Sequence, residues 1–242
     1  MKLHDIEKNI SDSTGQVFVI ENQAGIGGGC INTAMKLSGS GQLYFLKLNN
    51  ANRLDMFEAE AAGLVELAQA NAVRVPKPIC TGIVGSQAYI VLEHLDIGGS
   101  SRSAIHDFGG QLAQLHRYTN DRFGWLRNNT IGSTQQDNSW ADNWIDFYAD
   151  SRLRPQIGMA AERGIGRATV DTTNKIIDQL ADYFAGYEPQ ASLLHGDLWS
   201  GNYGVMSSGE PVIFDPATYY GDREADLAMT ELFGGFGSEF YT

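Results

Sequence analysis

The first ~90 residues alternate short apolar runs with polar and glycine-rich stretches, a pattern typical of a small sheet with one helix. Strands are predicted at Gln16–Asn22 and Gln42–Asn49, which flank a glycine cluster and would form a hairpin-like pair. Two further strands are expected at about Ile79–Val84 and Ala88–Glu93. Between the pairs, apolar residues recur three and four positions apart, and we predict a helix over Asn52–Asn71.

After His94 the apolar period becomes mostly helical. The expected helices are Ser103–Tyr118, Trp140–Ser151, Thr169–Phe184 and about Arg223–Phe233, with short strands at Ala191–Leu194 and Pro211–Phe214. The pattern predicts an α+β fold with two lobes. A small strand-rich lobe, residues 1–93, would be joined by Glu93–Asp96 to a larger helical lobe, residues 94–242. We expect a ligand to bind in the cleft between them.

Composition narrows the possible partners. The chain has 242 residues, with 17 Lys and Arg against 29 Asp and Glu, giving a net charge of −12. Such a field repels phosphates and argues against general binding of nucleic acid or anionic membranes. Only Cys30 and Cys80 are present, which is no disulfide framework, and no apolar run approaches the length of a membrane span. These observations predict a cytoplasmic protein with no nucleic-acid or membrane partner.

The strongest chemical signal is the segment His195-Gly-Asp197-Leu-Trp-Ser-Gly-Asn202. It has the spacing of a kinase catalytic loop, with four residues between the Asp and the Asn. Thirteen residues beyond Asn202, after a predicted strand, comes Asp215. We therefore predict Asp197 as the general base, with Asn202 and Asp215 as ligands of Mg²⁺ beside the phosphates of ATP. The alternative is that both aspartates merely cap turns.

The amino-terminal region supplies further candidates for nucleotide binding. Gly27, Gly28 and Gly29 lie between two strand-like runs, where a backbone without side chains can approach phosphates. Lys47 lies in the following strand and, taken alone, would extend its amine to solvent. Glu60 changes that expectation, because it falls inside an apolar helical stripe and needs a buried partner. A Lys47–Glu60 pair would orient the lysine toward the phosphates.

Other residues of these segments have open roles. Backbone groups of Glu93 and Leu95, at the lobe junction, would contact adenine, although a plain linker explains them almost as well. His195 is expected to hydrogen-bond nearby backbone, and His116 to be a core histidine. Asp226 would either cap the last helix or brace the catalytic loop.

These residues belong to a set of motifs in which the chain closely resembles the fructosamine (ketosamine) kinases. Those enzymes are relatives of the aminoglycoside phosphotransferases and have a protein-kinase-like fold. The resemblance covers almost the whole chain. Its motifs are GIGGGCIN (Gly25–Asn32), MFEAEAAGL (Met56–Leu64), VRVPKP (Val73–Pro78), VLEHL (Val91–Leu95), IGSTQQDNSWADNW (Ile131–Trp144), RLRPQ (Arg152–Gln156), HGDLWSGN (His195–Asn202), FDPATYYGDREADLAM (Phe214–Met229) and ELFGGF (Glu231–Phe236).

The resemblance implies ATP-dependent phosphorylation of a ketosamine at the sugar 3-hydroxyl, with the substrate free or attached to a lysine of a glycated protein. It implies the same roles for Asp197, Asn202, Asp215, Lys47 and Glu60. Trp199 would form part of the sugar site, the alternative being packing within its loop. Two other functions stay open: phosphorylation of an aminoglycoside or other small alcohol, and nucleotide binding without transfer, as in a pseudokinase.

The resemblance leaves three further expectations. The family often carries a cysteine at the position of Cys30, which suggests redox sensitivity, although a small buried thiol is an equal alternative. It also implies further helices beyond Phe236, so the carboxyl-terminal lobe is expected to lack the family's last helices. The assembly is expected to be a monomer or a homodimer.

Overall fold

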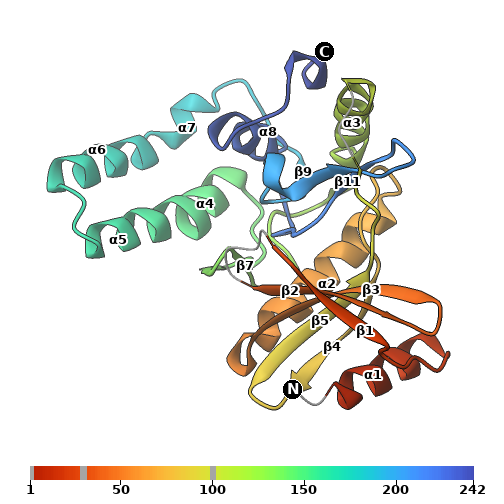
Figure 1. The fold of residues 1–242 in the computed structure, drawn as a ribbon. Helices are drawn as coiled ribbons and strands as arrows, with labels where there is room; N and C mark the ends of the chain where they lie inside the picture. Colours follow the sequence, from red (N-terminus) through yellow and green to blue (C-terminus); the bar gives the residue numbers. More distant parts are fainter. Residues whose placement is uncertain (1–2, 28–31, 99–101) are drawn as a thin grey trace.

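The computed structural model describes residues 3–27, 32–98 and 102–242. Its amino-terminal part is built on a five-stranded antiparallel sheet in the order β1-β2-β3-β5-β4 (Figure 1). The strands are β1 (Asn22–Ile26), β2 (Thr33–Gly39), β3 (Gln42–Asn50), β4 (Pro78–Val84) and β5 (Gln87–Glu93). Two helices accompany this sheet, α1 (His4–Thr14) and α2 (Leu54–Gln69), and a 3₁₀ turn, Ala51–Arg53, leads into α2.

The two helices cover opposite faces of the sheet, because successive side chains of a strand point to opposite sides. Tyr89 and Val91 of β5 pack in one cluster with Ile6 and Ile10 of α1. Their neighbours Ile90 and Leu92 belong to the other cluster, which contains Phe57, Leu64 and Leu67 of α2. Lys47 lies between Leu46 and Leu48, which both belong to the cluster of α1, so alternation places Lys47 on the face of α2.

The predicted hairpin-like pair is wrong. Residues 16–21 form no strand, β1 begins at Asn22, and β2 lies between β1 and β3. The β-rich run instead bonds to side chains of α1, since the Phe18 N–H donates to Ser11 Oγ and the Ile20 N–H to Glu7 Oε1. The α1 helix was not predicted, because its only buried apolar residues are Ile6 and Ile10.

The carboxyl-terminal part combines helices with short antiparallel strand pairs. Its helices are α3 (Arg102–Leu115), α4 (Trp144–Tyr148), α5 (Arg154–Glu162), α6 (Arg167–Asp178), α7 (Leu180–Tyr183) and α8 (Glu224–Leu232), with a π-helical turn at Ala149–Leu153 and 3₁₀ turns at Ser200–Asn202 and Ser238–Phe240. Its strands are β6 (Thr119–Asn120), β7 (Asn129–Ile131), β8 (Thr134–Gln136), β9 (Ala191–Leu194), β10 (Tyr203–Val205), β11 (Pro211–Ile213) and β12 (Tyr219–Gly221), paired as β12-β9-β6, β10-β11 and β7-β8.

The predicted elements here are confirmed in kind, with shifted boundaries, and the helix predicted over Ser103–Tyr118 is α3, which ends at Leu115. The helix predicted from Trp140 begins at Trp144, because the Asn143 side chain accepts the N–H groups of Ile145 and Asp146 and caps the helix there. The helix predicted over Thr169–Phe184 is divided into α6 and α7 at Gln179. Strands β9 and β11 and helix α8 fall where the apolar runs predict them.

One hydrophobic core joins the two parts of the chain. Phe57 and Leu64 of α2 belong to the same cluster as Leu194 and Leu198, which flank the start of the HGD segment. The connector before β4 also crosses over, since the Ile213 N–H donates to the Arg74 carbonyl at 3.0 Å. Helix α2 therefore packs directly on the elements that carry the predicted catalytic residues. The division into lobes at residue 93 stays a prediction.

Candidate active site

The HGD segment follows the buried strand β9 in a sharp turn at Gly196. Gly196 has φ 81°, and a Cβ at this position would lie 2.1 Å from the Ala217 carbonyl oxygen. Glycine is required here, because the backbone is left-handed and another chain segment lies against it. The turn leaves Asp197 half-buried, while the next side chain, Leu198, is completely buried and anchors the loop.

Asp226 of α8 holds this turn from beneath. Its fully buried carboxylate accepts the N–H of His195 and the N–H of Gly196, both at 2.9 Å, and contacts His116 Nε2 at 3.1 Å. Burial alone would raise the pKa of Asp226, but the contact with His116 and the other bonds outweigh it and lower the pKa. Of the two roles left open for Asp226, the structure supports bracing, and His116 is the satisfied core histidine that was expected.

His195 connects the turn to the segment of Asp215. Its Nε2 lies 2.9 Å from the Phe214 carbonyl oxygen, and its Nδ1 accepts the N–H of Asp197 at 3.3 Å. Because a carbonyl can only accept and an N–H can only donate, these bonds place the ring proton on Nε2. The expected structural role of His195 is confirmed.

Asn202 and Asp197 are in direct contact. Asn202 Nδ2 donates to the Asp197 backbone carbonyl at 2.8 Å and to Asp197 Oδ2 at 3.0 Å. The N–H of Phe214 in turn donates to the Asn202 carbonyl at 3.1 Å, which ties the 3₁₀ turn to the end of β11. Burial raises the pKa of Asp197, and the negative charge of Asp215 adds to this, so the carboxyl group is a stronger base than an exposed aspartate.

Lys47 joins the amino-terminal sheet to Asp215. Its Nζ lies 2.6 Å from Glu60 Oε1 and also donates to Asp215 Oδ1, and the lysine side chain is only 6% exposed. The predicted Lys47–Glu60 pair is therefore confirmed. Burial would lower the pKa of Lys47, but the charges of Glu60 and Asp215 outweigh it and raise the pKa, which keeps the amine protonated.

Asp215 and Asn202 fit the requirements of Mg²⁺. Asp215 has φ 58°, a left-handed conformation that is unusual outside glycine and marks functional positions in many proteins. Its carboxylate is 46% exposed, and only Oδ1 is used by Lys47. Because the Asn202 amide nitrogen donates to Asp197, the amide oxygen is left for a cation. Among the described residues, no three His, Cys, Asp or Glu side chains form a metal cluster.

The candidates for nucleotide binding are described in part. Gly28, Gly29 and Cys30 lie outside the described residues. Gly27 follows β1, and a Cβ there would meet no atom of the described residues within 4 Å. Glu93 ends β5, where its side chain pairs with Arg74 and its N–H donates to the Lys77 carbonyl at 2.8 Å. The Leu95 carbonyl accepts the N–H of Ile97.

Trp199 lies two residues after Asp197 and is 38% exposed. Its indole covers Gly201, where a Cβ would lie 2.3 Å from a ring carbon. The ring therefore packs within its own loop and still presents part of its surface to solvent, which leaves both roles considered for it possible.

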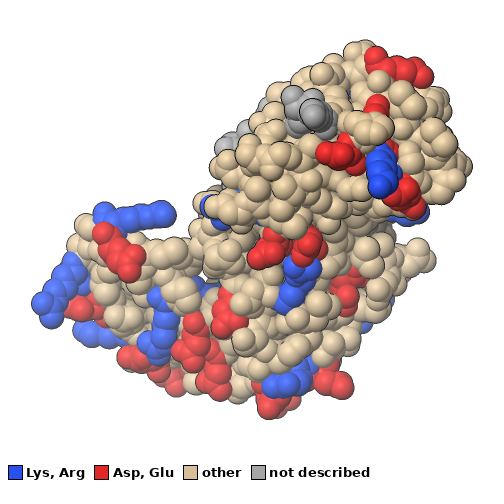
Figure 2. Space-filling model, turned by 90° about the horizontal axis from the view of Figure 1, so that it is seen from below, with Lys and Arg blue, Asp and Glu red and all other residues tan. Residues whose placement is uncertain are grey.

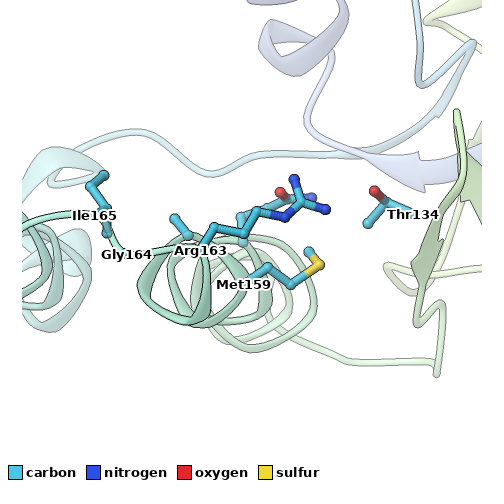
Figure 3. A pocket seen from close by; sticks show the side chains of 7 residues that line it. Thr134, Met159, Arg163, Gly164 and Ile165 are labelled. Atoms are coloured by element: carbon cyan, nitrogen blue, oxygen red, sulfur yellow. The ribbon is translucent and has the colours of Figure 1, made fainter.

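Two cavities lie away from Asp197. One, of about 470 Å³, is lined by α5 and β8, and Figure 3 shows Met159 and Arg163 on one wall with Thr134 on the other. The second, of about 400 Å³, lies between α2 and β4 and includes Val65, Cys80 and Leu126. The lining of neither cavity includes Lys47, Glu60 or a predicted residue of the segment 195–215.

Arg152 is a residue of the site region for which the sequence suggested no role. It lies in the π-helical turn, only 9% exposed, and its guanidinium packs against the rings of both Phe147 and Tyr219, 4.7 and 4.2 Å from their centroids. It donates to the Asp137 carbonyl at 2.8 Å and to the Asn138 side chain, and so joins the RLRPQ and DNSW motifs. The signal that could have found it is an arginine next to an aromatic stripe, since such an arginine needs buried acceptors.

On the face that Figure 2 shows, acidic and basic side chains are interspersed and form no large patch of one sign. None of the helices in residues 3–27, 32–98 and 102–242 is long and apolar enough to cross a lipid bilayer.

The sheet with α2 packed against it and the HGD segment after β9 define the protein-kinase-like fold. Solved structures support this fold: the aminoglycoside phosphotransferase APH(4)-Ia, in a thermostable mutant, superposes with a TM-score of 0.63 at 13% identity, over 97% of this chain and 80% of the other. A "Putative fructosamine-3-kinase" of Haemophilus somnus gives 0.89 at 29% identity, over 98% and 79%.

Sequence comparison narrows the class further. The fructosamine kinase family model matches residues 2–242. The "Probable ketoamine kinase" of Synechocystis is 44% identical over 98% of this chain and 79% of its own length. The chloroplastic protein-ribulosamine 3-kinase of Arabidopsis thaliana is 39% identical over 94% of this chain and 70% of its own length. The chain belongs to the fructosamine kinase family, and it is a kinase that uses ATP.

Proposed function

We propose that this chain transfers the γ-phosphoryl group of ATP to the 3-hydroxyl of a fructosamine or ribulosamine. The observation that carries the proposal is the double contact of Lys47 with Glu60 and Asp215, because it connects the sheet to the catalytic segment. The names of the relatives, a ketoamine kinase and a protein-ribulosamine 3-kinase, support the substrate class.

ATP would bind between the glycine turn and the catalytic segment. Lys47 is charged and held by two carboxylates, so it would face the phosphates without losing its orientation. The backbone of Gly27, Gly28 and Gly29 would approach the phosphates, and at Gly27 no atom of residues 3–27, 32–98 and 102–242 lies within 4 Å of the place of a Cβ. Adenine would contact backbone groups of residues 93–95. The side chain of Glu93 is not expected to take part, because it pairs with Arg74.

Asn202 and Asp215 would hold Mg²⁺ through the amide oxygen and the free carboxylate oxygen. When bound, the ion offsets the negative charge of the phosphates. Asp197 would accept the proton of the attacking hydroxyl. Asn202 Nδ2 orients the carboxylate for this task by donating to Oδ2, which leaves Oδ1 for the sugar.

The exposed part of Trp199 would provide an apolar face for the sugar C–H groups. The ketosamine would be used free or on a lysine of a glycated protein. The negative net charge favours the approach of its protonated secondary amine. We expect a cytoplasmic monomer or homodimer that binds no nucleic acid or membrane.

An ATP-consumption assay with fructose- and ribulose-amine adducts, and with an aminoglycoside for comparison, tests this function. Asp197→Asn should lower kcat about 10²–10⁴-fold with little change in the KM for ATP. The matched control is Asp142→Asn, whose side chain is 86% exposed, and it should keep wild-type kcat. Near-full turnover of Asp197→Asn would contradict the role of this residue. Turnover of the aminoglycoside alone, or ATP binding without transfer, would contradict the proposed substrate.

A further inference from the structure

We propose that Gly63 is a positioning residue, which seats α2 on the segment after Asp215 and thereby sets the place of the Lys47–Glu60 pair. This inference rests on the proposed function for its kinetic readout, and on nucleotide binding for a second readout. Its basis is the close approach of the α2 backbone at Gly63, in the motif MFEAEAAGL, to side chains of the motif FDPATYYGD, which is far away in the sequence.

The approach at Gly63 leaves no room for a side chain. A Cβ there would lie 2.8 Å from Thr218 Oγ1, 3.2 Å from Thr218 Cβ and 3.6 Å from Pro216 Cγ. Gly63 follows Glu60 by three positions, so the two residues share a face of α2. The face that carries the glutamate is thus the face that contacts the residues following Asp215.

The opposite side of this contact is held firmly. Thr218 is 1% exposed, and its carbonyl accepts Asn129 Nδ2 at 2.8 Å. The N–H of Ala217 donates to the His195 carbonyl at 2.9 Å, within the catalytic turn. An added side chain at residue 63 would therefore displace α2 more readily than the segment, and Glu60 would move with the helix.

Two further contacts keep α2 in the same place. The Tyr220 hydroxyl donates to Glu66 Oε1 at 2.6 Å, one turn after Gly63. Arg127 Nη2 pairs with Glu58 Oε2 at 3.3 Å, near the start of the helix. The carboxyl-terminal part thus contacts α2 before, at and after Gly63, and it determines where the carboxylate of Glu60 meets Lys47.

The test is Gly63→Ala, with Gly110→Ala in α3 and Gly158→Ala in α5 as matched controls. At both control positions a Cβ would meet nothing within 4 Å in the part of the chain that the structure describes. Alanine has a higher helix propensity than glycine, so the two control variants should keep the wild-type kcat and keep or raise the Tm. Gly63→Ala should lower kcat about tenfold, weaken ATP binding in a calorimetric titration, and leave the KM for the ketosamine unchanged, because a small displacement at the reacting groups is costly.

A second substitution, at Thr218, distinguishes a misplaced α2 helix from a general loss of folded structure in Gly63→Ala. Thr218 Oγ1 is buried without a hydrogen-bond partner in the described part of the chain, so Thr218→Ala alone should leave kcat near wild type. Added to Gly63→Ala, Thr218→Ala should restore most of kcat and of ATP affinity, whereas Thr218→Ser, which keeps the oxygen, should not.

Two results would overturn the proposal: wild-type kcat and ATP affinity in Gly63→Ala, or equal rescue by both Thr218 variants. Failure of the proposed function looks different. If ketosamines are not phosphorylated, the loss of ATP affinity in Gly63→Ala and its selective rescue by Thr218→Ala are still expected.

Discussion

The catalytic segment, residues 195–226, and the helical hairpin of α5 and α6, residues 154–178, are stabilised in different ways. In the catalytic segment the polar side chains of His195, Asn202 and Asp226 are buried and hydrogen-bonded. The α5–α6 hairpin extends away from the rest of the molecule (Figure 1), and α5 buries no residue while α6 buries only Ile177.

The contrast shows what precise geometry requires. A buried polar group that loses its partner is costly, so each bond in the catalytic segment excludes other arrangements of the backbone. The hairpin is held partly by ion pairs of Arg154 with Asp150 and Asp178, all of which are largely exposed. Exposed pairs contribute little to stability, and such a region tolerates change.

The largest effect is expected from Asp226→Ala. The substitution leaves two backbone N–H groups and His116 without their acceptor, which should cost about 3–5 kcal/mol and lower Tm by roughly 10 °C. The low pKa of Asp226 means that its contribution is present at neutral pH and is lost as pH falls through that pKa. Thermal melts against pH measure both quantities.

The matched control is Asp178→Ala on the hairpin, whose side chain is 66% exposed and which should melt as the wild type does. Equal melting of both variants would remove the distinction between the two regions.

The second effect concerns Arg152, which lies where the two regions meet. Arg152→Met removes the donor to the carbonyls of Asp137 and Ser151 and to the Asn138 side chain. Because these acceptors would be left without their partner, we expect a loss of about 1–3 kcal/mol in the free energy of unfolding, measured by urea titration. A gain in stability would show that the apolar stacking on Phe147 and Tyr219 outweighs the hydrogen bonds.

The third prediction is a pH profile. Burial raises the pKa of Asp197 above its ordinary value of 3.8, and a general base acts in its ionised form. The value of kcat/KM should therefore fall, by about tenfold per unit, once pH drops below a pKa higher than 3.8. Circular dichroism over the same range checks that the protein stays folded. An acid limb centred at or below 3.8 would show that Asp197 is not perturbed by its surroundings.

The smallest effect is expected from Arg154→Met, two residues after Arg152. Both ion pairs of Arg154 are exposed, so Tm and kcat should be unchanged within the error of the measurement. A clear loss of stability would mean that the hairpin depends on these pairs more than its exposure indicates.

Much of the candidate site could be predicted because its chemistry is local in the sequence. The HGDLWSGN spacing places Asp197 beside Asn202, and one turn and one 3₁₀ helix are enough to bring them into contact. The pairing of Glu60 with Lys47 could be predicted because Glu60 lies in an apolar stripe, and a buried carboxylate needs a cation. The order of strands β1, β2 and β3 was not predicted, because Thr33–Gly39 contains only two large apolar residues, Met35 and Leu37, and was not recognised as a strand.

The sequence by itself pointed to the family, to the candidate residues that the fold brings into contact and to most local elements, since spacing and periodicity act over one or two turns of chain. Only the tertiary structure decided that Asp226 accepts the N–H groups of residues 195 and 196, that Arg152 joins two motifs, and that α2 is seated at Gly63 against Thr218. These contacts connect residues of different elements, some far apart in the chain. They depend on how the elements pack together, which no local pattern records.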